Sequence, residues 1–118
     1  MTEAVVGQEL ARAVAQALQG GKILAETHRD YCGIGLAWLQ GQFICAEVFD
    51  GEITTPQMAQ NMRSRGENPE FQAFPDEAAF IAWLAAQSDA SLSGRELPNS
   101  WAHDNQRLTI ARLQAFVA

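Results

Sequence analysis

Residues 31–49 read YCGIGLAWLQGQFICAEVF. Two apolar, β-favouring runs, 31–39 and 43–49, flank the dipeptide Gln40-Gly41, and this pattern predicts a β-hairpin. Gln-Gly fits a type I′ turn, and it fits equally a type I turn followed by a left-handed Gly41. The first turn places Cys45 near Leu36 and the second places it near Gly35. Because a one-residue slip moves every side chain to the other face of the sheet, both registers stay open.

The first predicted strand has two unequal faces. One face carries Cys32, Ile34, Leu36 and Trp38, and the other carries Gly33, Gly35 and Ala37. Small residues allow another segment to approach the backbone closely, and a helix packed on the sheet is the simplest such segment. Since both faces are mostly apolar, we expect helices on both faces, or one face kept for a partner.

The segments around the hairpin show helical patterns. Residues 2–19 place an apolar side chain at every fourth position, with Thr2 as the N-cap and Gly20-Gly21 as the stop signal. The other expected elements are a helix capped by Thr54 or Thr55 with Pro56 in its first turn, a short strand at 71–74, a helix at 75–87 and a last helix capped by Thr109.

Residues 88–105 read as a long connector, and residues 22–30 as either the beginning of a strand or a connector. The resulting order is α-β-β-α-β-α-α. It predicts one α+β domain over residues 1–118, in which a small antiparallel sheet, the hairpin plus a short strand, carries packed helices.

Composition is typical of a folded soluble protein. The chain has 118 residues, of which 47% are hydrophobic and 19% are charged, and no apolar run reaches the roughly 18 residues of a membrane span. The first residues, MTEAVVGQELARAV, lack the basic region of a signal peptide, so we expect a cytoplasmic protein. In that compartment, and at this offset in the hairpin, Cys32 and Cys45 are expected to be free thiols.

Charge is unevenly distributed along the chain. Residues 47–77 contain seven acidic and two basic residues, a local charge of −5, whereas the remaining residues contain seven acidic and six basic, a charge of −1. An acidic segment repels nucleic-acid phosphates, so we expect no nucleic-acid binding. The excess favours either a basic protein partner or simply solubility.

Catalytic and metal motifs are absent from the sequence. Glu47 lies in an apolar strand, where burial could raise its pKa, and a pocket near Glu47, Cys32 and Cys45 would suit a small enzyme or ligand-binding domain. The alternative is that Glu47 faces solvent and protects a strand edge. No CxxC or HxxxH pair is present, and Gly33-x-Gly35 is not followed by a helix start. We therefore expect no catalytic residue, metal or cofactor.

Two tryptophans are poorly explained by a core stripe. Trp38 lies near the hairpin tip, and Trp101 lies in the long connector, where it either plugs the core or contacts a partner. Tryptophan is enriched at the energetic centres of protein interfaces. An acidic segment beside exposed aromatics would attract a basic protein and then hold it by burial.

Two C-terminal segments resemble small bacterial proteins. They are AFIAWLAAQSDASLSG, residues 79–94, and NQRLTIARLQAFV, residues 105–117, together about a third of the chain. As a short, acidic chain without catalytic motifs, it is also similar to immunity proteins of contact-dependent and other polymorphic toxin systems. The resemblance implies a cytoplasmic protein that binds and blocks a toxin domain, often a basic nuclease.

The leading hypothesis is therefore a cytoplasmic immunity protein that occludes a basic toxin domain. The expected partner-binding residues are Glu47, Asp50, Glu52, Glu67, Glu70, Trp38 and Trp101. The alternatives are the small enzyme or ligand-binding domain, and a secretion chaperone, which would have to dimerise to present a groove.

Overall fold

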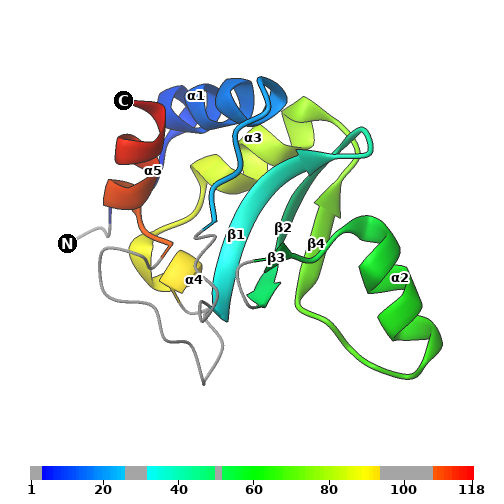
Figure 1. The fold of residues 1–118 in the computed structure, drawn as a ribbon. Coiled ribbons are helices and arrows are strands. Elements are labelled where there is room, and N and C mark those ends of the chain that lie inside the picture. Colours follow the sequence, from blue (N-terminus) through cyan, green and yellow to red (C-terminus); the bar gives the residue numbers. More distant parts are fainter. Residues whose placement is uncertain (1–3, 26–31, 50–51, 94–107) are drawn as a thin grey trace.

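The computed structural model describes residues 4–25, 32–49, 52–93 and 108–118 (Figure 1). The elements are α1 (Gln8–Gln19), β1 (Cys32–Leu39), β2 (Gln42–Phe49), β3 (Glu52–Ile53), α2 (Pro56–Ser64), β4 (Phe71–Phe74), α3 (Glu77–Ala85), α4 (Asp89–Ser93) and α5 (Ile110–Val117). All strand pairs are antiparallel, and helices pack on the sheet, so the predicted α+β class is confirmed.

The hairpin forms at the expected place and uses the type I′ turn. Gln40 has φ 54° and Gly41 has φ 77°, so both central residues are left-handed, as this turn requires. The register pairs Leu39 with Gln42 and Leu36 with Cys45, which selects the first of the two predicted registers. The turn thereby decides which side chains face the core.

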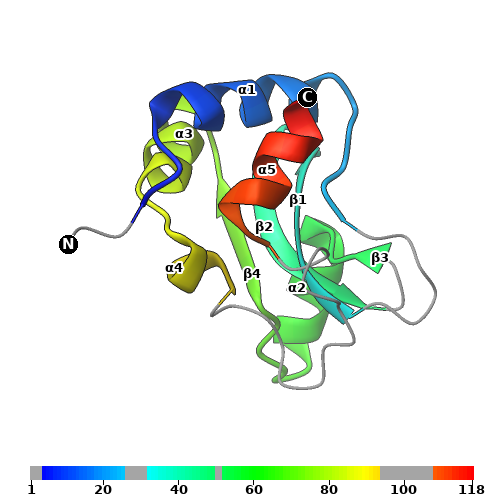
Figure 2. The same cartoon turned by 90° about the vertical axis from the view of Figure 1, so that its left-hand side faces the viewer.

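The sheet is assembled on β2. One edge of β2 pairs along its whole length with β1, while the other edge is shared by β4 near Phe43 and by β3 near Val48. The sequence pattern predicts β4 but not β3, because a two-residue strand has no periodicity. α2 connects β3 to β4 and lies on the side of the sheet away from α5 (Figures 1 and 2).

One sheet face, here called the helix face, forms the main core. Its side chains Ile34, Leu36, Phe43 and Cys45 are buried together with residues of α1, α3, α4 and α5. Phe43 stacks on Phe80 of α3 with ring centroids 4.7 Å apart. The opposite face forms a smaller cluster of Ala37, Ile44 and Ala46, against which Leu39, Ile53 and Phe71 pack. The centres of both faces are thus buried, and the residues that pack against the second cluster belong to the strands β1, β3 and β4.

The surroundings of Gly35 show which segment approaches the small-residue face of β1. A Cβ on Gly35 would lie 2.7 Å from the Leu24 carbonyl oxygen, a distance that no real Cβ adopts. Leu24 forms an isolated bridge with Leu36, with both backbone bonds at 2.9 Å. The close neighbour of Gly35 is therefore the segment at Leu24, rather than a helix, and residues 22–25 contribute a single bridge rather than a strand.

The first helix begins later than predicted. It starts at Gln8 after Gly7, which has φ 82° and offers no side-chain cap, and Thr2 lies outside the described residues. The Val6 N–H donates to the Gln87 carbonyl at 2.8 Å, and the Gly7 N–H donates to the Ala85 carbonyl at 2.9 Å. These tertiary bonds hold residues 6 and 7 against the C-terminal end of α3, so the N-terminal part of the helical pattern stays outside the helix.

The other helix boundaries follow their caps. Thr55 caps α2, Asp76 caps α3 and Thr109 caps α5, each through a side-chain oxygen that accepts a backbone N–H. α3 therefore spans Glu77–Ala85 rather than the predicted 75–87. The predicted connector over residues 88–105 contains an additional short helix, α4, whose first turn is closed by bonds between Ser88 and Ser91.

Replacement of Gln40 by Asn should stabilise the protein by about 0.5 kcal/mol, because Asn tolerates the left-handed conformation better and Asn-Gly is the preferred type I′ pair. Urea unfolding measures the difference. Gly41→Ala is the control, and it should lower stability by about 1 kcal/mol or more at φ 77°. A Gln40→Asn protein less stable than the original would mean that contacts outside the turn hold Gln40.

Replacement of Thr109 by Ala should cost about 1 kcal/mol of stability, because the Thr109 hydroxyl accepts the Arg112 N–H at 3.1 Å. The substitution should lower the free energy of unfolding of the whole protein and not only of α5, since α5 buries Leu113 in the main core. Thr109→Ser keeps the cap and should stay within about 0.5 kcal/mol of the original. Equal losses in Ala and Ser variants would assign the effect to the lost methyl group.

Candidate functional site

Glu47 lies where the edge of β2 changes partner. Its N–H donates to the Glu70 carbonyl at 2.9 Å, and its own carbonyl accepts the Thr54 N–H at 2.9 Å and the Thr54 hydroxyl at 3.0 Å. Thr54 is 3% exposed, so this hydroxyl bond satisfies a polar group that would otherwise be buried alone. One residue thus joins the strand that precedes α2 to the strand that follows it.

The same geometry brings three carboxylates to one end of the helix face. Residues directly opposite in antiparallel strands share a face, so Glu70, bonded opposite Glu47, projects to the same side. Glu52 pairs with Phe49, two residues beyond Glu47, and alternation puts it on that side as well. Glu47, Glu52 and Glu70 are called the acidic end below.

The environment of Glu47 differs from that of its neighbours. Burial raises the pKa of the Glu47 carboxyl above its ordinary value, and repulsion by the Glu70 carboxylate raises the pKa further. Glu47 is half-buried, whereas Glu52 and Glu70 are exposed. Glu47 thus has an environment between that of a buried carboxyl and that of a fully solvated one.

The two basic residues of the acidic segment are engaged locally. Arg65 pairs with Glu67 at 2.8 Å, so Glu67 carries a compensated charge. Arg63 lies 5.5 Å from the centre of the Phe71 ring and donates to the Phe71 carbonyl at 3.4 Å. Glu67 is bonded through its N–H to Met62 at the end of α2, so it belongs to the α2 loop rather than to the acidic end.

Trp38 is exposed but lies apart from the acidic end. It is 39% exposed, and its ring centroid is 6.5 Å from that of Phe43, its cross-strand partner. Ile34, which pairs with Glu47, is four residues away along β1, a separation of roughly 13 Å. The structure therefore does not join Trp38 and the acidic end into one compact patch. Asp50 and Trp101, the other two predicted residues, lie outside the described residues.

A pocket near Glu47 and Cys45 is not among the hollows that the structure describes. Cys45 is a buried cysteine of the main core that forms no disulfide, and the side chain of Cys32 lies outside the described residues. The described hollows lie instead along α1, against α3 or α5. Within the described ranges, no three His, Cys, Asp or Glu side chains are placed to hold a metal ion. No helix there is long and apolar enough to span a membrane.

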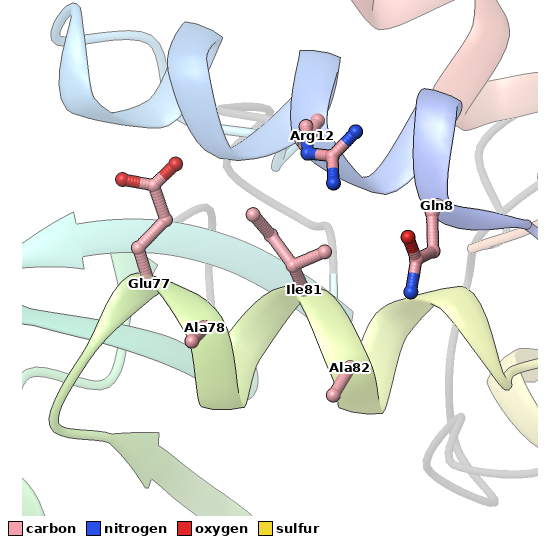
Figure 3. Close-up of a pocket in the computed structure, with 6 residues that line it drawn as sticks. All are labelled: Gln8, Arg12, Glu77, Ala78, Ile81 and Ala82. Carbon is pink, nitrogen blue, oxygen red and sulfur yellow. The ribbon is translucent and has the colours of Figure 1, made fainter.

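One of these hollows combines charges that the sequence analysis did not single out. It lies between α1 and α3 and measures about 430 Å³ (Figure 3). Its lining residues are Gln8, Arg12, Glu77, Ala78, Ile81 and Ala82. The sequence feature that could have pointed to this hollow is the α3 run Glu77-Ala-Ala-Phe-Ile-Ala-Trp-Leu-Ala85, a helix with no charged residue after its first position.

Replacement of Glu47 by Gln should stabilise the protein at neutral pH. With a raised pKa, folded Glu47 holds its proton more tightly than the unfolded chain does. Its contribution to stability is therefore complete below the unfolded pKa and is lost as the pH rises through the folded pKa. Gln removes this loss, so urea midpoints should favour Glu47→Gln at about pH 7 and converge at about pH 3.5.

The control for this prediction is Glu52→Gln, an exposed change in the neighbouring strand, which should alter stability by less than about 0.5 kcal/mol at either pH. A Glu47→Gln protein less stable than the original at neutral pH would contradict the cost assigned to the Glu47 charge.

Comparison with known proteins returns no protein family model, no curated protein and no solved structure similar to this chain. The resemblance to toxin-immunity proteins accordingly stays a prediction.

Proposed function

We propose that this chain is a protein-binding module, a cytoplasmic immunity protein that binds a basic toxin domain and occludes it. The observation that carries the proposal is the acidic end, where Glu47, Glu52 and Glu70 come from three chain segments to one side of the sheet. Like charges opposite each other in a sheet lower stability. We therefore infer that this cluster of like charges, which lowers the stability of the fold, serves recognition.

The local charge balance supports a basic partner. Arg65 is paired with Glu67 and Arg63 is held against Phe71, so neither arginine reaches across to neutralise Glu47 or Glu52 in the described structure. Exposed carboxylates would accelerate encounter with a basic domain by long-range attraction. A lysine or arginine seated on Glu47 would stabilise its charged form and lower its raised pKa.

Trp38 is the proposed apolar contact. A standard interface covers about 800 Å² of each partner, which is wide enough to include Trp38 and the acidic end, whose nearest residue Glu47 lies opposite Ile34, roughly 13 Å along β1 from Trp38. The stack of Phe43 on Phe80 lies behind Trp38 and supports it from the core. Asp50 and Trp101 are included in the proposed surface on the basis of the sequence alone. Glu67, which is paired with Arg65, is proposed to lie at the border of this surface.

A charge reversal at the acidic end should slow association with the partner. The partner to test is the product of the gene directly upstream, as expected for an immunity protein, purified as an inactive variant. Glu52→Lys should reduce the association rate more than Glu9→Lys, which makes the same charge change at an exposed residue of α1. The difference should shrink at high salt, because exposed charges are screened.

Both variants should stay folded, with stability changes below about 0.5–1 kcal/mol. Equal losses for the two variants would mean that only net charge matters and would remove the acidic end as a site. If neither variant loses association and Trp38→Ala does, the recognition surface is at the hairpin instead. Absence of any binding, together with no rescue of growth when toxin and chain are co-expressed, would reject the immunity function.

A further inference from the structure

After Glu77, α3 carries only apolar residues, including those on its solvent-facing side. Phe80 and Leu84 point into the core and are fully buried. The outward positions, where a surface helix normally carries charged or polar residues, are Ala78, Ala79, Ala82 and Ala86, all exposed. Alanine side chains let another helix approach closely, so the outer face of α3 is suited to contact with a second surface.

The hollow beside this face carries one charge of each sign. Figure 3 shows the Arg12 guanidinium above Ile81 and the Glu77 carboxylate one helical turn earlier along α3. Within the described part of the chain, neither the Arg12 guanidinium nor the Glu77 carboxylate makes a hydrogen bond or an ion pair. Ile81, between them, is half-buried and offers apolar area. Two opposite charges thus flank an apolar floor without meeting each other.

We propose that this face binds a second copy of the same chain in a symmetric dimer. A two-fold axis passing near Ala78 and Ile81 would run the two α3 helices antiparallel. Arg12 lies above Ile81, which is about 6 Å along the helix axis from Glu77 of the same copy. The two-fold axis would therefore bring each Arg12 opposite Glu77 of the other copy. A surface that contains both signs is complementary to itself, as a two-fold interface requires.

Charge balance favours a second copy over a basic or acidic partner at this face. Although the chain carries a net charge of −6, the lining of the hollow has one positive and one negative residue and is neutral. The acidic end lies at the far end of β2 from α1 and α3 (Figure 1), so a dimer through α3 would leave both acidic ends open. The dimer therefore does not depend on the proposed toxin partner.

Sedimentation velocity of the full chain over a range of concentrations tests the proposal. The original protein should show a monomer–dimer equilibrium that weakens as salt is raised. Arg12→Glu and Glu77→Arg should each weaken self-association by about tenfold or more, because each places like charges across the two-fold axis. An equimolar mixture of these two variants should recover dimerisation, since every contact then joins opposite charges.

Recovery in the mixture shows that residue 12 of one copy meets residue 77 of another, a species that stops at the dimer shows that the contact is two-fold, and both readings require that the variants are folded. Far-UV circular dichroism of each variant alone verifies the fold. Should one of them unfold, Arg12→Gln and Glu77→Gln replace the pair, and each must still weaken the dimer. An original protein that stays monomeric at about 1 mM would overturn the proposal, as would variants that associate as strongly as the original or a mixture that shows no recovery.

Discussion

The two-residue turn at Gln40-Gly41 is the constraint on which the other parts of the structure depend. A type I′ turn pairs Leu36 with Cys45 and so puts both on the helix face. The same register places Phe43 under Phe80, where the two rings stack, and it carries Glu47 to the end of the sheet. A slip of one residue would exchange the two faces of one strand, bury Glu47 under the opposite cluster and separate the aromatic stack.

Much of the architecture was accessible from sequence because its signals are local. The hairpin, the helices capped by Thr55 and Thr109, and the strand at 71–74 each rest on residues within a few positions of one another. The errors occur where distant segments meet. α1 starts at Gln8 because the backbone N–H groups of Val6 and Gly7 donate hydrogen bonds to the carbonyls of Gln87 and Ala85. The residues next to Val6 and Gly7 in the sequence give no sign of these bonds.

The candidate site shows the same division between local and distant information. Counting charges identified the acidic segment, but it could not separate Glu67, which is paired with Arg65, from Glu47 and Glu70, which meet across strands. That distinction requires the register of β2 with both β3 and β4. Likewise, the exposure of Trp38 agrees with the sequence analysis, whereas its distance from the acidic end follows only from its place along β1.

The bonds at Glu47 have a consequence for how this fold could be altered. Thr54 and Glu70 both bond to Glu47, so the two ends of the segment that holds α2 lie side by side. Of the helix itself, only Ala59 is fully buried. A segment with adjacent ends and little buried surface can be shortened, lengthened or exchanged while the sheet on either side keeps its pairing. Such a position is a natural place to graft a foreign loop or a reporter domain into this protein.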